Sequence, residues 1–268
     1  MPREPAELAP AWSALAASRQ PPSIFLTPEW IAVARSHEQT DPITLAVGDR
    51  GVAALAREAD GTLTFAGGQL TDEQDVVAAP GDAADVAAAA ARWVASERPP
   101  RVRLEYVPEE RPTLEAFATA LAAAGYRVAA GRQTVSPVLA LPDTYETYVQ
   151  SLGKKERHEL RRKVRRLETA GRATFRFASG GERSAVLDRF FALHRLSRGE
   201  KADFMTSAVE RFFRDVADAL GPLDRLRLGV LGIDGTDAAV LFGFALGRVI
   251  ALYNAAARRN VLSFAPAL

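Results

Sequence analysis

The sequence predicts an α/β (α+β) protein of two domains, whose mixed, largely antiparallel sheets are flanked by helices. Its 268 residues suit about two domains of ordinary size. The composition is 48% hydrophobic and 25% charged, which is typical of globular proteins with apolar cores. Helical and strand patterns also occur together in each half. Hairpin turn signals stand at 48–51, Asp234-Gly235 and Gly247-Arg248, which favours antiparallel pairing.

In the first half, a clear helix start is indicated at Thr27, a residue type that caps helices. Pro28 follows it and suits the first helical position. A hairpin is expected around 48–51, and then a strand that leads through glycines into an acidic loop. The remaining expected elements are an Ala-rich helix at 83–97 capped by Asp82, a strand at 101–107, and a helix that ends at Gly125.

The second half follows a related order, which starts with a strand and a helix and ends with three strands. Between them lie a long basic helix that stops near Gly171, another strand, and two amphipathic helices. The expected ranges are 136–142 for the first strand, 143–152 for the first helix, and 225–234, 238–246 and 249–256 for the last three strands.

The charge differs sharply between the halves. Residues 1–135 hold 12 basic and 18 acidic residues, whereas residues 136–268 hold 22 basic and 15 acidic ones. Within 154–166, eight Lys or Arg residues stand against two Glu. Leu160, Val164 and Leu167 form one narrow apolar stripe on this helix, and two cationic stripes flank it. The helix is either a solvated charged face or a surface that meets phosphates.

Several classes of chemistry are excluded or disfavoured. The chain has no cysteine, which excludes disulfides, thiolate metal sites and thiol nucleophiles. Its three histidines, His37, His158 and His194, lack metal-ligand spacing, so no metal site is expected, and His194 is interpreted as a histidine at the edge of a core. The start of the chain lacks a signal-peptide pattern, and the apolar window 238–257 carries Arg248 and Asn254; a cytoplasmic protein is predicted.

The stretch SLGKKERHELRRKVRRLETAG at 151–171 resembles a signature of the acetyltransferase-like proteins known as CelD-like (cellulose biosynthesis) proteins. They belong to the GNAT superfamily and are related to the FemAB-type aminoacyl transferases. Five further stretches agree in the family's order and extend the resemblance over nearly the whole chain. They are FLTPEW, FAGGQLTDEQDVVAAPG, SPVLALPDTYETYVQSL, FFALHRLSRGEKADFM with VERFFRDVADAL, and the strand meander that begins at LRLGVLGIDG.

The resemblance implies tandem GNAT-like domains, an N-terminal one at 1–133 and a C-terminal acyltransferase domain at 134–268. In such domains the pantetheine arm of acyl-CoA enters beside the fourth strand, and the following loop and helix N-terminus bind the pyrophosphate. The fourth strand corresponds to 249–256 and the loop to 257–268. The helix and fifth strand that would follow are missing, and Ala267 stands where the family has glycine, so we expect the second domain to be truncated and incomplete.

The resemblance also places candidate site residues. Tyr253 and Asn254, at the end of the fourth strand, are candidates for a catalytic proton donor and an orienting amide, although Tyr253 also suits a half-buried strand aromatic. Asp72 and Glu73 lie in a loop that either lines a groove or is simply solvated. The residues expected to bind acyl-CoA are Arg258, Arg259, Asn260, Ser263, Phe264 and Ala265, and those expected to contact substrate phosphates are Lys154, Lys155, Arg157 and Arg161.

Three functions are compatible with these residues. The first is transfer of an acyl group from acyl-CoA to an amine or hydroxyl of a cell-envelope or polysaccharide precursor. The second keeps the fold and uses aminoacyl-tRNA as donor, which the basic helix favours. The third is a non-catalytic scaffold of polysaccharide synthesis, which the missing elements favour. The acceptor, the acyl group and the oligomeric state are not identified by the sequence.

Overall fold

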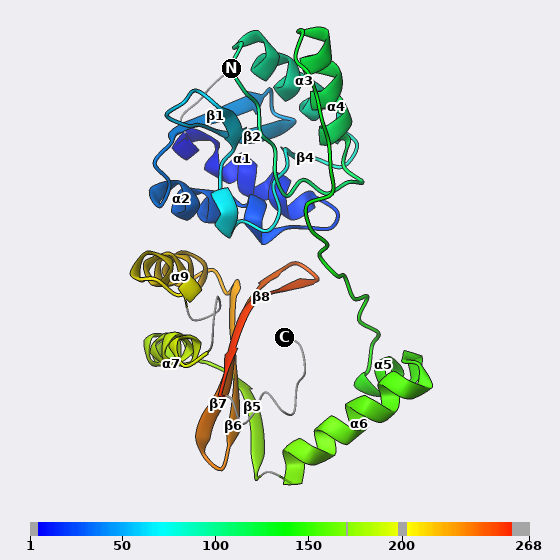
Figure 1. The fold of residues 1–268 in the computed structure, drawn as a ribbon, viewed down its shortest axis with the longest axis vertical. Helices are drawn as coiled ribbons and strands as arrows, with labels where there is room; N and C mark the ends of the chain where they lie inside the picture. Colours follow the sequence, from blue (N-terminus) through cyan, green and yellow to red (C-terminus); the bar gives the residue numbers. More distant parts are fainter. Residues whose placement is uncertain (1–4, 170, 198–202, 259–268) are drawn as a thin grey trace. The chain divides into compact units, whose positions relative to one another are not determined.

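The computed structural model of the chain describes residues 5–169, 171–197 and 203–258 (Figure 1). The chain divides into two compact units. The first runs to Thr134 and also takes in Asp215–Arg225 and Ala245–Ala251. The second comprises Val135–Arg214, Leu226–Phe244 and the chain from Leu252 onward. Both contain helices and sheets, which confirms the predicted fold class.

The part of the first unit that runs to Thr134 contains one sheet and four α-helices among its described residues. Its strands are β1 (Asp41–Val47), β2 (Gly51–Arg57), β3 (Leu63–Phe65) and β4 (Val77–Ala78). Its helices are α1 (Pro5–Ser18), α2 (Pro28–Ser36), α3 (Ala83–Ser96) and α4 (Pro112–Ala123), with the short 3₁₀ turns η1 (Ile24–Leu26) and η2 (Gly68–Leu70).

Strand β2 is the centre of this sheet. It pairs antiparallel with β1 along its whole length, with β3 at its end and with β4 at its start. The Ala-rich helix α3 packs its buried side against this sheet, since Val86, Ala90 and Val94 recur at helical spacing and are at most 1% exposed. A Cβ at Gly51 would lie 2.6 Å from the Val86 methyl groups, so glycine permits this close approach of strand and helix.

Helix α2 begins where the sequence predicts. Thr27 is its N-cap: the Thr27 hydroxyl accepts a hydrogen bond from the Trp30 backbone N–H at 3.4 Å and donates one to the Ile24 carbonyl at 2.7 Å. Pro28 occupies the first helical position, where its missing N–H costs nothing. The cap thus joins η1 to α2 at a buried position.

Replacing Thr27 by alanine is expected to lower the free energy of unfolding of the first unit by about 1 kcal/mol, because it removes this cap. All three tryptophans, Trp12, Trp30 and Trp93, lie in the first unit, so urea unfolding followed by tryptophan fluorescence reports on that unit. Ser36→Ala, an exposed change at the other end of α2, is the control, with an effect within about 0.5 kcal/mol. Equal effects of the two changes would contradict the capping role.

A four-stranded sheet in the order β5-β6-β7-β8 belongs mainly to the second unit. Its strands are β5 (Ala173–Phe177), β6 (Leu226–Ile233), β7 (Thr236–Leu246) and β8 (Val249–Ala257). The described helical elements that accompany it are α5 (Tyr145–Ser151), α6 (Lys154–Thr169), the 3₁₀ turn η3 (Gly180–Glu182), α7 (Arg183–Arg195) and α9 (Ser207–Leu220). The three strands predicted at the end of the sequence therefore lie in one sheet.

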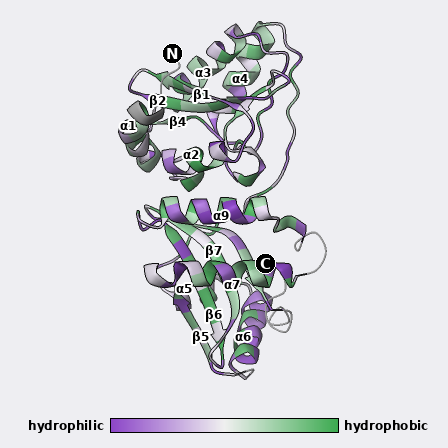
Figure 2. Cartoon of the chain, turned by 90° about the vertical axis from the view of Figure 1, so that its left-hand side faces the viewer, coloured by the Kyte–Doolittle hydropathy of each residue, from purple (hydrophilic) through white to green (hydrophobic). Residues whose placement is uncertain are grey.

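Helices α7 and α9 cover one face of this sheet (Figures 1 and 2). The core between them is aromatic. Phe190 of α7, Phe213 of α9 and Phe242 of β7 are each at most 1% exposed, and their ring centroids lie 4.8 to 5.7 Å apart. Such offset and edge-on ring contacts stabilise a core beyond simple area burial.

Two predicted strands are wrong. Residues 101–107 contribute only one parallel bridge, Leu63 to Val102, because β3 spans just three residues and offers little more to pair with. Residues 136–142 form no strand, and Val138 is 94% exposed. Pro137 and Pro142 remove two backbone donors from that short stretch, which disfavours sheet pairing.

Two further details differ from the sequence analysis. Asp82 stands at the N-cap of α3, but its side chain makes no capping hydrogen bond and instead lies 3.6 Å from the Arg50 guanidinium. Helix α1 was not predicted.

Among the helices of the described residues, none is long and apolar enough to cross a membrane.

Candidate functional site

Strand β8 is the last strand in the described sheet and carries the two residues predicted to be catalytic. It follows β7 through the tight turn at Gly247-Arg248, where Gly247 has a positive φ of 57°. Its neighbour in the sheet order is β7, so in the described part of the chain β8 presents the outer edge of the sheet. Ile250 and Leu252 on this strand are 56% and 69% exposed. An open strand edge with apolar side chains suits an extended ligand that carries amide groups.

Asn254 is held by a buried histidine of α7. The Nε2 atom of His194, which is 1% exposed, lies 2.8 Å from the Asn254 Oδ1. The same oxygen accepts the Ala255 backbone N–H at 2.7 Å. That second bond fixes which end of the amide is the oxygen, since a flipped amide would set NH₂ against N–H. His194 Nε2 is therefore the donor, and the Asn254 amide nitrogen is left to point elsewhere.

The ring of Tyr253 belongs to the aromatic core. Its centroid lies 5.4 Å from that of Phe213 and 5.5 Å from that of Phe244, and the residue is partly buried. This agrees with the expectation of a half-buried strand aromatic. Because the ring packs in the core, a catalytic role for Tyr253 depends on its hydroxyl.

The residues predicted to bind acyl-CoA are only partly described. The Arg258 backbone N–H donates to the Ala238 carbonyl at 2.9 Å, which ties the end of β8 to the start of β7. Five others lie outside the described residues, namely Arg259, Asn260, Ser263, Phe264 and Ala265.

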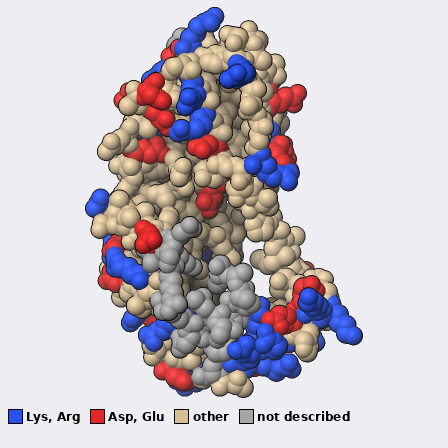
Figure 3. All heavy atoms as spheres, viewed as in Figure 1, with Lys and Arg blue, Asp and Glu red and all other residues tan. Residues whose placement is uncertain are grey.

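The basic helix α6 forms as predicted, but the packing expected of its apolar stripe does not occur. No described side chain of α6 is buried, and Val164 in that stripe is 37% exposed. Figure 3 shows the Lys and Arg side chains gathered over this helix, and Figure 2 shows much of it in the hydrophilic colour. Lys154, Lys155 and Arg161 are exposed, and Arg157 is partly exposed.

One acidic residue offsets part of this charge. The Glu159 carboxylate contacts the Arg162 guanidinium at 2.6 Å and the Lys163 ammonium at 3.7 Å. The hydrogen bonds from Arg162 lower the pKa of Glu159 to about 2, so this carboxylate stays ionised. Most of the eight cations remain exposed to solvent, and an anion would relieve their mutual repulsion.

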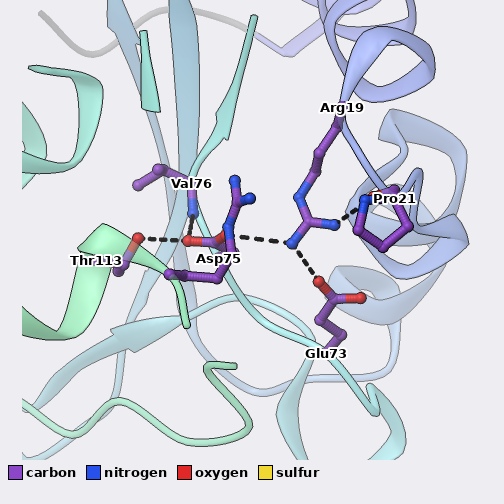
Figure 4. A network of polar contacts seen from close by, with 7 residues as sticks. Arg19, Pro21, Glu73, Asp75, Val76 and Thr113 are labelled. Atoms are coloured by element: carbon purple, nitrogen blue, oxygen red, sulfur yellow. Dashed lines mark hydrogen bonds and ion pairs between the residues drawn. The ribbon is translucent and has the colours of Figure 1, made fainter. Parts of the chain in front are cut away.

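In the acidic loop of the first unit, Asp72 and Glu73 have different surroundings. Asp72 lies at the surface, yet loss of water around its carboxyl raises the pKa of Asp72 to about 6. Glu73 is not simply solvated, because it forms an ion pair with the buried Arg19 (Figure 4). Arg19 also contacts Asp75 at 3.3 Å and donates to the Pro21 carbonyl at 2.6 Å. Glu73 is thus part of a structural network.

Sequence reasoning missed the role of His194. Its position near Phe190 predicted a histidine at the edge of a core, which its burial confirms. The contact with Asn254 joins residues 60 positions apart, and no local pattern signals it. In the part of the chain that the structure describes, no group of three or more His, Asp or Glu residues is arranged to hold a metal ion.

Residues 154–268 match the family model described as an acetyltransferase (GNAT) domain. This match covers less than half of the chain, and it agrees with the GNAT resemblance of the second half. No match was found among the curated proteins. The narrower CelD-like assignment remains a prediction.

Two solved structures share the fold. The crystal structure of FemX aligns with a TM-score of 0.61 at 13% identity, over 99% of this chain and 82% of that one. The C-terminal domain (DUF2156) of an Agrobacterium fabrum protein described as a lysylphosphatidylglycerol synthetase aligns with a TM-score of 0.51 at 13% identity, over 97% of this chain and 72% of that one. At these identities the likeness concerns the fold alone.

Proposed function

We propose that the protein is an acyltransferase that moves an acyl group from acyl-CoA to an amine or hydroxyl of a cell-envelope or polysaccharide precursor. The observation that carries this proposal is the pair of Tyr253 and Asn254 on the outer strand β8 of a GNAT-type domain, with the Asn254 amide fixed by His194. The two domains at 1–133 and 134–268 are proposed to be tandem GNAT-like domains.

The chemistry assigns each residue a role. In acyl transfer the acceptor loses a proton and bonds to the thioester carbon, the carbon–sulfur bond breaks, and the departing thiolate gains a proton. The Tyr253 hydroxyl is the proposed donor of that last proton. The Asn254 amide nitrogen, whose direction is set by the bonds on Oδ1, is proposed to donate to a substrate oxygen.

Acyl-CoA suits the residues that are described. The amides of a pantetheine arm can bond to the outer edge that β8 presents in the described sheet, in the manner of an added strand. Arg258 follows the strand directly, and Arg259, Asn260, Ser263, Phe264 and Ala265 complete the proposed donor site. Arginine pairs well with phosphates because its planar guanidinium donates two parallel hydrogen bonds. Phosphates of the donor or acceptor are proposed to be contacted by four residues of α6, namely Lys154, Lys155, Arg157 and Arg161. Asp72 is proposed to contact a group of the acceptor.

Calorimetric titration with acetyl-CoA tests the donor assignment. Saturable binding is expected, with a Kd within roughly 1 μM to 1 mM, the range usual for enzyme substrates. Titration with acetate and with inorganic pyrophosphate provides the control, since neither contains the pantetheine arm. No saturable binding of acetyl-CoA would remove acyl-CoA as the donor and would favour the non-catalytic scaffold.

The charge of α6 supports a second candidate, transfer from aminoacyl-tRNA, which also fits the FemAB relationship expected from the sequence. In that case the protein shifts tRNA in a gel, and changing Arg161, Arg162 and Arg165 to Glu abolishes the shift, because phosphate contacts dominate such binding. A control variant changes Arg127, Arg132 and Arg248 to Glu and alters net charge equally outside α6. Unchanged tRNA mobility with the wild-type protein would exclude this candidate.

A further inference from the structure

The first unit contains a polar pocket that none of the proposed transferase residues lines. It has a volume of about 210 Å³ and lies between the end of α2, the strand β3, the turn η2 and the segment around Glu105. This volume is below the roughly 300–1,000 Å³ of sites that hold drug-sized ligands, so the pocket suits a small molecule. Its charged lining residues are Glu38, Glu58, Arg103 and Glu105.

The charge of the pocket favours a cation. Arg103 is shared between two of the carboxylates: it forms an ion pair with Glu58, and its Nε lies 3.3 Å from the Glu105 carboxylate. The third carboxylate, Glu38, accepts the Gly67 backbone N–H at 2.8 Å and the Thr40 hydroxyl at 3.3 Å. Arg35 acts on Glu38 electrostatically but does not line the pocket. Three carboxylates against one guanidinium leave the lining negative.

A buried amide oxygen gives an independent sign of a ligand. Gln74 lines the pocket and is 3% exposed. Its Nε2 donates to the Gly68 carbonyl at 3.0 Å, which fixes the orientation of the amide. Among the described residues its Oε1 is one of the few buried side-chain atoms without a hydrogen-bond partner. A buried acceptor left unpaired is costly, so a ligand N–H or O–H that reached it would be bound favourably.

We propose that this pocket binds a small organic ligand that carries an ammonium group together with further N–H or O–H donors. The ammonium is attracted by the negative lining, and a second donor reaches the Gln74 oxygen. A bare metal ion does not suit the pocket, because in the described part of the chain no three carboxylates converge as metal ligands. Gln74 also borders a cavity of about 10 Å³, roughly the space of one water, and a water bound to Oε1 there is the competing explanation.

NMR titration of the whole chain with three sugars of one shape tests the proposal. D-glucosamine carries an ammonium, D-glucose is neutral, and D-glucuronate is an anion. We expect glucosamine to shift the backbone amide signals of Gly67, Gly68 and Gln74 saturably, with a Kd at least about tenfold lower than that of glucose, since hydrogen bonds between charged groups are stronger. Glucuronate is expected to leave these signals unchanged. Ethanolamine serves as a second ammonium probe without the ring.

Variants locate the binding. Glu105→Gln and Gln74→Met are each expected to raise the glucosamine Kd by about tenfold, and Glu109→Gln, at a 72% exposed carboxylate paired with Arg132, to leave it unchanged. A thermal melt checks that Gln74→Met folds, and Glu105→Gln keeps the test valid if it does not. No saturable shift with either ammonium probe, equal shifts with all three sugars, or an unchanged Kd in both variants would overturn the proposal. None of these results depends on acyl transfer.

Discussion

Replacing Asp75 by alanine is expected to lower the free energy of unfolding of the first unit by roughly 3–5 kcal/mol, the cost of removing one partner from a buried ion pair. The Asp75 side chain is fully buried. Its carboxylate accepts the Val76 backbone N–H at 2.8 Å, the Arg111 Nε at 2.7 Å and the Thr113 hydroxyl, and it faces Arg19 at 3.3 Å. Without it, Arg19, which is 3% exposed, keeps a buried charge that Glu73 alone among the described carboxylates offsets (Figure 4).

Urea unfolding followed by tryptophan fluorescence measures this effect, because the tryptophans lie in the first unit alone. Asp75→Asn is expected to lower the free energy of unfolding by less than Asp75→Ala, because the amide keeps one acceptor oxygen although it loses the charge. Glu109→Ala, at an exposed carboxylate, is the control, with a change within about 0.5 kcal/mol. A loss of under about 1 kcal/mol for Asp75→Ala would show that the network does not stabilise the unit.

Replacing Tyr253 by phenylalanine is expected to lower kcat of acyl transfer by about 10²-fold or more, the usual contribution of a positioned proton donor. The change removes only the hydroxyl. The ring keeps its place among Phe213, Phe242 and Phe244, so thermal stability is expected to change little. The variant therefore separates catalysis from packing, the two roles that the sequence left open for this residue.

Steady-state release of free thiol from acetyl-CoA, measured with a defined amine or hydroxyl acceptor, gives the value of kcat. Tyr145→Phe in α5 is the matched control, because it removes the same hydroxyl from a 58% exposed residue. A Tyr253→Phe enzyme with kcat within twofold of the wild type would leave Tyr253 as a core aromatic and nothing more.

The sequence predicted best where a local pattern has one physical meaning. Thr27-Pro28 predicted the start of α2, the Ala-rich stretch predicted α3, and the glycine turns predicted the order of β6, β7 and β8, as the structure confirms. It failed where an extended stretch needed a partner. Residues 136–142 are mostly apolar, but Pro137 and Pro142 remove two of the backbone donors that pairing with a neighbouring strand needs.

The candidate site was predictable only in part. Tyr253 and Asn254 were proposed through the resemblance, since nothing in their spacing marks them, and their catalytic roles stay a prediction. The bond from His194 to Asn254 and the ion pair of Arg103 with Glu58 join residues far apart in the chain. Contacts of this kind follow from the register of strands and helices, which propensities and periodicity leave open.

Strand β8 is the element proposed to receive the acyl donor. The most direct test is an NMR titration of the isotope-labelled chain with acetyl-CoA that maps which backbone amides respond. We predict saturable shifts of the backbone amides along 252–258 and smaller shifts on α6, which is proposed to contact phosphates. In the His194→Ala variant we predict that the β8 shifts are lost, because His194 holds the Asn254 amide. Saturable shifts confined to other elements, or none at any concentration, would contradict it.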